Sequence, residues 1–172
     1  MDLSSHALIV IDLQQRIVAL STAPHSTEEV LERVQQLASA FRSCGLPVIF
    51  VRTVNLDRPE EDGDRLAPRI RRHATDLLVT KHQWGAFHGT PLDLQLRRSG
   101  VRGVVLAGVM TNFGIESTAR AADELGYAVV LVEDASSSFT SEAHEFAVKE
   151  IFPRFGATIV DTDEVLRAVD VS

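Results

Sequence analysis

Short, continuous apolar runs recur along the chain and constrain its fold more than any other feature. Each run lacks the apolar–polar alternation of a strand with one solvated face, which is typical of strands covered on both sides. The six expected strands are residues 7–11, 48–51, 77–80, 104–109, 128–132 and 157–160. Because helical segments separate these runs, the sequence predicts an α/β fold: a three-layer, doubly wound, six-stranded parallel sheet of the Rossmann-like kind, with right-handed crossovers.

The segments between the runs carry helix-capping signals. Ser26 and Glu29 have the spacing of a capping box, and apolar residues then recur at helical intervals until Gly45. Further helices are expected from Thr90 as N-cap with Pro91 in the first turn to Gly100, from 114 to about 125, from 141 to 152, and from Asp161, where Glu164 gives a second capping box. Residues 54–76 are polar and predict a functional rim or lid that contains a short helix.

Length and charge limit the classes of function. We expect residues 1–172 to form a single domain, and the net charge of −7 makes nucleic acid and an anionic membrane surface unlikely partners. The chain has no apolar run of the roughly 18 residues that a membrane span needs, and its start lacks the basic residues of a signal peptide. The single cysteine, Cys44, rules out an internal disulfide and predicts a reducing, cytoplasmic location.

Three candidate functional groups stand at carboxyl ends of expected strands. Asp12 ends the first strand, Lys81 ends the third, and the turn from Met110 to Gly114 follows the fourth. In a doubly wound sheet this edge binds ligands, and the first N–H groups of the helix after the turn can hold negative charge. One charge at a strand end is usually a solvated exit, but three at one edge predict a site. The alternative is an Asp12–Lys81 ion pair that orders the sheet edge without chemistry.

Four stretches that include these residues resemble the isochorismatase-like (cysteine hydrolase) superfamily. They are IVIDLQ at 9–14, TKHQWGAFHGTPL at 80–92, GVMTNFGIESTARAADELGY at 108–127 and VVLVEDASSS at 129–137. The resemblance implies a six-stranded parallel sheet and a homo-oligomer, dimer or tetramer. It also implies an Asp–Lys–Cys triad that maps to Asp12, Lys81 and position 114. A cis peptide is implied at Val109–Met110, which would aim the N–H groups of Met110 and Gly114 into the site.

Position 114 departs from the usual pattern of that superfamily, because glycine stands where the cysteine nucleophile is expected. Glycine has no side chain, so covalent catalysis from this position is excluded. Cys44 cannot substitute, because it lies at the far end of the first long helix. The isochorismatases proper also have glycine here, and their aspartate protonates the methylene carbon of an enol-pyruvyl ether so that water can add. The resemblance thus agrees with a non-covalent hydrolase and equally with an inactive protein, and Gly114 could also serve only helix–sheet packing.

Further residues are predicted to bind substrate. Gln14 either contacts substrate, holds Asp12 or is a solvated loop amide, and Arg52 either binds a carboxylate or forms a surface ion pair. The other predicted substrate-binding residues are Trp84, Phe87, Met110, Thr111 and Phe113, with core packing as the alternative for the aromatic rings. No metal is predicted, because residues 51–56 lack the His-x-His pattern of some related amidases. No nucleotide cofactor is predicted, because no phosphate-binding glycine pattern follows the first strand.

The sequence therefore predicts a cytoplasmic hydrolase that lacks a cysteine nucleophile and acts on a small anionic metabolite. Asp12 is its general acid or base and Lys81 the charged partner of Asp12, while the amides of Met110 and Gly114 hold an anion. The bond to be broken is either an enol ether or a C–N bond. The alternative from another class is a catalytically degenerate protein that binds a small molecule on the same fold.

Overall fold

The computed structural model describes residues 1–170, so residues 171–172 of the predicted domain lie outside the described part. It contains a six-stranded sheet in the order β3-β2-β1-β4-β5-β6, in which every neighbouring pair is parallel. The strands are β1 (His6–Ile11), β2 (Val48–Thr53), β3 (Leu77–Lys81), β4 (Gly103–Val109), β5 (Ala128–Ser137) and β6 (Thr158–Val160). The predicted fold class is confirmed. Strand order reverses between β1 and β4, and the carboxyl ends of these strands border the crevice where ligands bind in such sheets.

The observed strands match the predicted ones closely except for β5. This strand continues to Ser137, five residues beyond the predicted end. Its register against β4 shifts between Leu106 and Gly108, so that Gly108 pairs with Ser136. The apolar run stops at Glu133 and Asp134, so apolar patterning alone could not indicate that pairing resumes beyond them.

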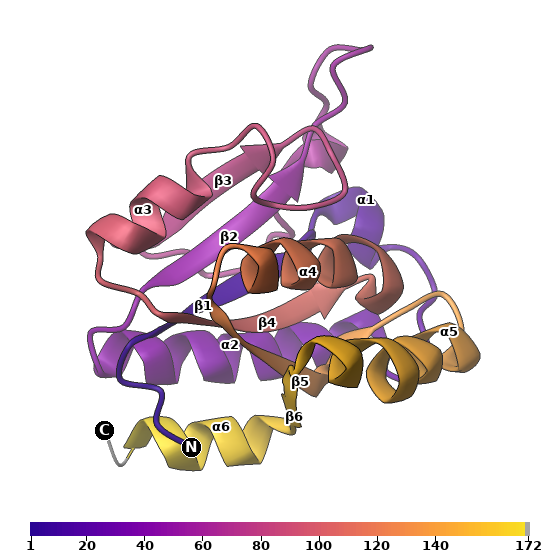
Figure 1. Ribbon diagram of the computed structural model, residues 1–172. Coiled ribbons are helices and arrows are strands. Elements are labelled where there is room, and N and C mark those ends of the chain that lie inside the picture. Colours follow the sequence, from indigo (N-terminus) through magenta and orange to yellow (C-terminus); the bar gives the residue numbers. More distant parts are fainter. Residues whose placement is uncertain (171–172) are drawn as a thin grey trace.

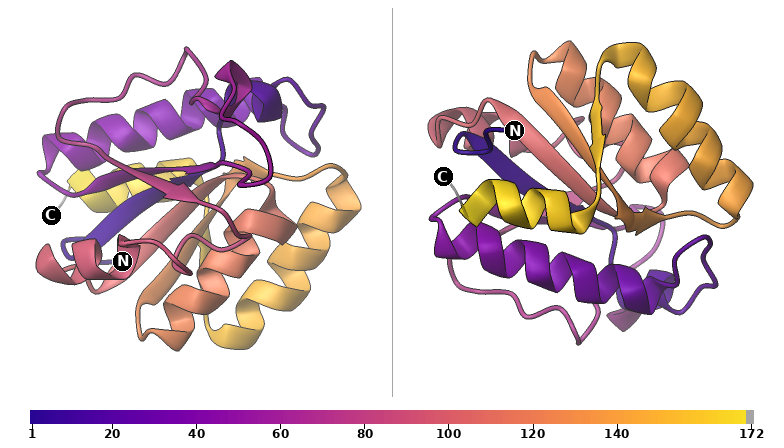
Figure 2. Two further views of the ribbon diagram at one scale, coloured as in Figure 1. Left: turned by 90° about the horizontal axis from the view of Figure 1, so that it is seen from above. Right: turned by 90° about the horizontal axis from the view of Figure 1, so that it is seen from below.

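Helices cover both faces of the sheet (Figure 1). The two views of Figure 2 show α2 (Thr27–Ser43) and α6 (Thr162–Asp170) on one face and the other long helical segments on the opposite face. That opposite face carries α3 (Leu92–Arg98), α4 (Glu116–Glu124) and α5 (Ser141–Phe146), which continues through η3 (Ala147–Ile151) and η4 (Phe152–Phe155). Three short elements lie at the carboxyl edge of the sheet: α1 (Gln15–Val18), η1 (Asp62–Asp64) and the π-helical turn η2 (Thr111–Ile115).

The capping signals form as predicted in two of three helices. Ser26 and Glu29 form the capping box of α2, and Asp161 and Glu164 exchange the equivalent hydrogen bonds at the start of α6. The prediction for α3 is wrong by one residue, because Pro91 and not Thr90 is the N-cap. The Thr90 hydroxyl instead accepts a hydrogen bond from the Leu92 N–H at 3.2 Å.

Two apolar cores lie on opposite faces of the sheet. The alternation of side chains along β1 sends Leu8 and Val10 into the core beneath α2 and α6. Ile9 and Ile11 enter the core beneath α3 and α4. Because both faces are covered, the free surface near β1 is its carboxyl end, where the chain turns at Asp12.

The polar segment 54–76 packs against this same edge. Its short helix is η1, and backbone hydrogen bonds join it to the chain after β1: the Gln15 N–H donates to the Arg65 carbonyl at 2.9 Å, and the Ala67 N–H donates to the Leu13 carbonyl at 2.9 Å. These bonds attach the segment to α1 as a wall beside the sheet edge. Among residues 1–170, no helix has the length and apolar character to cross a membrane.

Candidate active site

Asp12 and Lys81 meet at the carboxyl edge of the sheet. Asp12 follows β1 directly with a left-handed backbone conformation (φ 54°), which aspartate tolerates better than most residues. Lys81 is the last residue of β3, and its Nζ lies 2.9 Å from Asp12 Oδ2. The two strands are separated by β2, whose last residue, Thr53, donates a hydrogen bond from Oγ1 to Asp12 Oδ1 at 3.0 Å. Thr53 was not among the predicted site residues, although it occupies the same strand edge.

The Lys81 ammonium is buried and fully engaged. Its side chain is 2% exposed, and Nζ also donates to the carbonyls of Trp84 at 2.8 Å and Gln83 at 3.3 Å. An ammonium group has three protons to donate, and these three oxygens can accept them. The loop after β3 is thereby wrapped around the ion pair.

The environment of Asp12 favours its protonated form. Burial raises the pKa of the Asp12 carboxyl above its ordinary value and outweighs the Lys81 charge and the hydrogen bonds from Lys81 and Thr53, which lower it. A carboxyl group in this condition can donate a proton closer to neutral pH than an exposed aspartate can.

Gly114 lies against this pair, in the π-helical turn η2. A Cβ placed on Gly114 would lie 3.2 Å from Asp12 Oδ2, 3.4 Å from Lys81 Nζ and 3.0 Å from Ile11 Cγ2. The Val109–Met110 peptide that leads into the turn is cis, as the resemblance implied. Cys44 is the C-cap of α2, and its Sγ donates a hydrogen bond to the Val169 carbonyl at 3.4 Å. It is therefore not part of the group formed by Asp12, Lys81 and Gly114.

A cavity of about 420 Å³ opens above these residues. Seven of the predicted site residues line it: Asp12, Gln14, Lys81, Trp84, Met110, Phe113 and Gly114. Sequence reasoning did not assign the other lining residues to the site: Arg16, Ile17, Thr53, His82, Gln83, Val109 and Phe139. Most of these follow a strand end within a few residues, which is the one signal that could have found them.

Three predicted substrate-binding residues lie outside the cavity lining. The side chains of Arg52 and Phe50, two residues apart on β2, lie on the same face of the sheet, and Phe50 packs in the core beneath α2. Arg52 Nη1 donates a hydrogen bond to Glu60 at 2.5 Å, and Arg52 Nε donates to Thr80 Oγ1 at 3.0 Å. It therefore forms the ion pair of the alternative interpretation. Phe87 is 9% exposed and stacks on Tyr127 with ring centroids 5.9 Å apart, so it belongs to the core.

Thr111 is the third of these residues, and its side chain packs on the side of the η2 turn that faces α5. Its side chain is fully buried, with Oγ1 2.8 Å from Nδ1 of His144 on α5. Burial and the neighbouring His25 lower the pKa of His144 to about 4, so this imidazole is neutral at physiological pH. Thr111 thus joins the turn at the carboxyl edge of the sheet to α5, and it does not line the cavity.

Three aromatic rings form one wall of the cavity. The Phe113 ring lies between the others, with its centroid 4.9 Å from that of Trp84 and 6.0 Å from that of Phe139. Trp84 is 62% exposed and Phe139 is 51% exposed. Rings at these separations attract one another, and their free faces can stack on a planar ligand.

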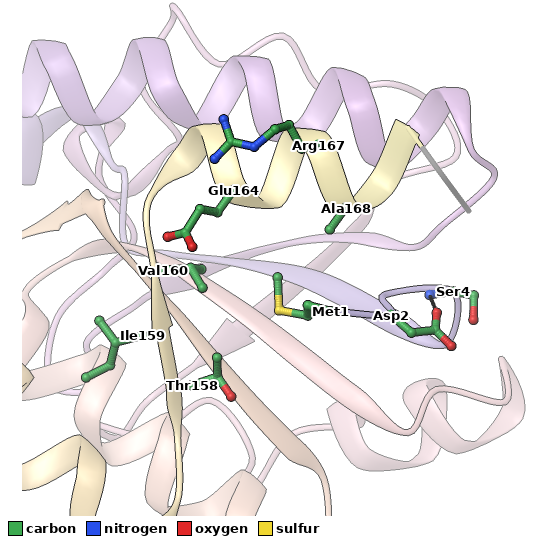
Figure 3. Close-up of a pocket in the computed structure, with 9 residues that line it drawn as sticks. All are labelled: Met1, Asp2, Ser4, Thr158, Ile159, Val160, Glu164, Arg167 and Ala168. Carbon is green, nitrogen blue, oxygen red and sulfur yellow. Dashed lines mark hydrogen bonds between the residues drawn. The ribbon is translucent and has the colours of Figure 1, made fainter.

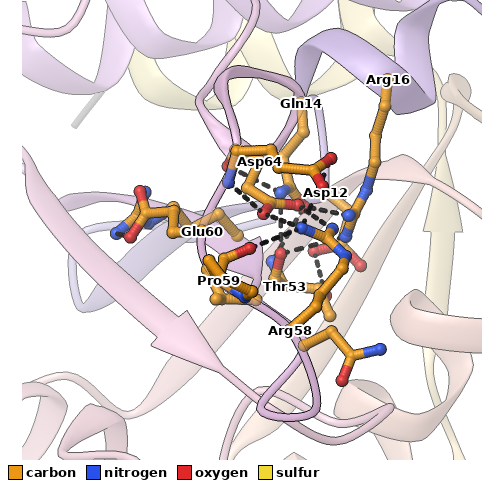
Figure 4. Close-up of polar contacts among 12 residues, drawn as sticks. Asp12, Gln14, Arg16, Thr53, Arg58, Pro59, Glu60 and Asp64 are labelled. Carbon is orange, nitrogen blue, oxygen red and sulfur yellow. Dashed lines mark hydrogen bonds and ion pairs between the residues drawn. The ribbon is translucent and has the colours of Figure 1, made fainter.

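The side chain of Gln14 is buried and links the end of β2 to the segment 54–76, so it is not a solvated loop amide. Its Nε2 donates to the carbonyls of Thr53 at 2.8 Å and Asp64 at 2.7 Å, and its Oε1 accepts from the Thr53 N–H at 2.8 Å. Figure 4 shows this network, in which the side chains of Arg16 and Arg58 also converge on Asp64. The network fixes the segment 54–76 against the ends of β1 and β2.

A larger hollow of about 840 Å³ lies elsewhere, beside the edge strand β6 and the N-terminal residues (Figure 3). Its charged groups include Glu164, which caps α6, and Arg167. It shares no lining residue with the cavity at Asp12, Lys81 and Gly114. Within residues 1–170 no cluster of three or more His, Cys, Asp or Glu side chains could hold a metal ion.

Comparisons with known proteins identify the family to which the chain belongs. The sequence matches the isochorismatase domain over residues 6–164. It is 39% identical to the uncharacterized isochorismatase family protein YecD of Escherichia coli O157:H7 over 95% of each chain. It is 29% identical to nicotinamidase 3 of Arabidopsis thaliana, over 95% of this chain and 88% of the relative. The structure of an isochorismatase family protein from Burkholderia thailandensis superposes with a TM-score of 0.90 at 41% identity, covering 97% of this chain and 96% of that one. The chain therefore belongs to the isochorismatase family of hydrolases.

Proposed function

We propose that this protein hydrolyses a small anionic substrate without a covalent enzyme intermediate, with Asp12 as the general acid and base. The observation that carries the proposal is the Asp12 carboxyl on the cavity wall beside Gly114, 15% exposed and held by Lys81 and Thr53. A glycine offers no nucleophilic atom, so the proton-transferring group must act directly on substrate and water.

The raised pKa of Asp12 supports cleavage of an enol ether. The protonated carboxyl would transfer its proton to the terminal methylene carbon, leaving a cation that is stabilised by the ether oxygen. Water then adds to the ether carbon and returns one proton to the Asp12 carboxylate. The resulting hemiketal separates into an alcohol and a carbonyl compound, so that one water is consumed and Asp12 is regenerated.

The relationship to nicotinamidase 3 supports a C–N bond as the second candidate. In that reaction the ionised Asp12 would take a proton from water while the water oxygen attacks the amide carbonyl carbon. The same proton would then pass to the leaving nitrogen as the C–N bond breaks. Lys81 would keep Asp12 ionised in this case, against the effect of burial.

Asp12→Asn is expected to lower turnover by about 10²- to 10⁴-fold, the usual contribution of a general acid or base. The substrates to test are carboxylate-bearing enol ethers and amides, with products measured by mass spectrometry. Asp123→Asn, which changes an exposed aspartate on α4, makes the same change of charge and should leave turnover unaltered. Turnover by Asp12→Asn at the wild-type rate would exclude the acid–base role. Ligand-induced stabilisation without turnover of any compound favours the alternative of a binding protein.

Gly114→Cys distinguishes the two bonds. The new Cβ would lie 3.4 Å from Lys81 Nζ, whose charge favours a thiolate, and 3.2 Å from Asp12 Oδ2, which can accept the thiol proton. Ile11 and Asp12 must each shift by a few tenths of an ångström to admit it. In a Cys44→Ser background, we expect rapid alkylation by iodoacetamide at neutral pH and an acyl adduct with amide substrates, seen by intact-protein mass spectrometry. Gly114→Ala controls for the added bulk. An alkylated variant that forms no adduct with any amide would weigh against the C–N bond.

A further inference from the structure

Arg16 places a guanidinium group on the cavity wall. It belongs to the short helix α1, its side chain is 34% exposed, and it lines the cavity together with Asp12 and Lys81. We propose that Arg16 is the specificity-determining residue of this cavity and binds the carboxylate of its ligand. The inference deepens the proposed function and rests on it for the identity of the reacting edge, but not for the binding itself.

The charges of the cavity favour an anion. Among the described residues that line it, there is one acidic side chain, Asp12, and two lysine or arginine side chains, Lys81 and Arg16. The ammonium group of Lys81 already donates to Asp12 and to the carbonyls of Gln83 and Trp84, so it has no proton left for a ligand. Arg16 is therefore the cation whose counter-ion does not line the cavity.

The acid that holds Arg16 already has a guanidinium partner. Asp64 is fully buried and forms an ion pair with Arg16 Nη1. Arg58 binds both oxygens of the same carboxylate, with Nη1 2.9 Å from Oδ2 and Nη2 2.7 Å from Oδ1. A bidentate pair of this kind neutralises a carboxylate effectively. The other acid near Arg58, Glu61, is 69% exposed at 3.6 Å and so is largely screened by water.

Asp64 and Thr53 orient Arg16 towards the reacting edge. Arg16 Nη2 donates to the Thr53 carbonyl at 3.3 Å, and the hydroxyl of the same Thr53 donates to Asp12. One residue thus links the guanidinium to the acid, as Figure 4 shows. A carboxylate bound by Arg16 would lie on the same side of the cavity as Asp12, where its negative charge would further favour a protonated Asp12.

The aromatic wall suggests how to test this assignment. Trp84 is the only tryptophan of the chain, and it lines the cavity, so its fluorescence reports ligands directly. Benzoate and benzamide are planar rings of nearly equal size that differ in charge. Both can stack on the wall formed by Trp84 and Phe113, but only benzoate can pair with Arg16.

Benzoate and benzamide are each titrated into the protein while the fluorescence of Trp84 is recorded. We expect benzoate to bind wild-type protein at least about tenfold more tightly than benzamide, and added salt to weaken benzoate binding only. Arg16→Gln should reduce the ratio to less than about twofold, and Arg16→Lys should leave it between these values because the planar fork is lost. Arg65→Gln is the matched control: Arg65 lies in the segment 54–76 that packs against α1, its side chain is 68% exposed, and it does not line the cavity.

Equal affinities for the two rings in the wild type, no response to either ring, or a preference for benzoate that survives Arg16→Gln would each overturn the proposal. Melting temperatures of all variants show whether each variant keeps its fold. A protein that prefers benzoate through Arg16 but hydrolyses nothing would contradict the hydrolase proposal and leave this assignment standing.

Discussion

The Gly108→Ala variant is expected not to fold. Gly108 has φ +119°, and a Cβ at this position would lie 2.2 Å from the Ile11 carbonyl oxygen and 2.8 Å from the Ile11 nitrogen. The obstructing atoms are backbone atoms of the neighbouring strand, where Gly108 pairs with Ile11, so no side-chain rotation relieves the overlap. We expect the free energy of unfolding to fall by more than about 4 kcal/mol, a large share of the roughly 5–15 kcal/mol that stabilises a typical domain. Soluble expression, circular dichroism and urea unfolding measure the effect.

Gly126→Ala is the matched control for that variant. Gly126 also has a positive φ, +83°, but a Cβ there would meet nothing within 4 Å. Gly126→Ala should therefore lower the free energy of unfolding by backbone strain alone, about 1 kcal/mol. Similar losses of unfolding free energy for the two variants would mean that the close approach of β4 to β1 does not restrict position 108 to glycine.

Lys81→Met is expected to destabilise the protein by about 3–5 kcal/mol, the cost of leaving a buried ion without its partner. Asp12 would lose its cation, and the carbonyls of Gln83 and Trp84 would lose a donor. We expect turnover to be lost as well, because the loop that carries Trp84 is held by the same ammonium group. Urea unfolding gives the change in the free energy of unfolding.

The pH dependence of Lys81→Met has a definite sign. Without Lys81, only the Thr53 hydrogen bond opposes the effect of burial, so the pKa of Asp12 rises further above the unfolded value of 3.8. The folded state then binds the Asp12 proton more tightly than the unfolded state. The contribution of Asp12 to stability is thus greatest below pH 3.8 and falls as pH rises towards the folded pKa. The variant should therefore lose less stability, relative to wild type, at pH 5 than at pH 8.

The double variant Asp12→Asn/Lys81→Met tests whether the loss comes from the ion pair. Removal of both charges leaves no unpaired ion in the buried site, so the double variant should be more stable than Lys81→Met at pH 8. Strictly additive losses would show that Asp12 and Lys81 are not energetically coupled. In that case the packing of the lysine stem would account for the effect of Lys81→Met.

Local patterns in the sequence determined the strands, the capped helices and the edge at which the site lies. An apolar run or a capping box is stabilised mainly by residues close in sequence, and the carboxyl ends of parallel strands meet at one edge. Asp12, Lys81 and the turn at Gly114 could therefore be placed together before the structure was known.

The tertiary structure alone decided which side chains surround that edge. Arg52 stands at the end of β2 as Asp12 stands at the end of β1, but its strand parity directs it to Glu60, away from the cavity. Arg16 enters the cavity because Asp64, 48 positions along the chain, is buried beside it. Contacts of this kind depend on how distant segments pack, and no short-range pattern in the sequence records them. The sequence by itself thus determined where the candidate site lies, and the packing of distant segments decided which charges surround it.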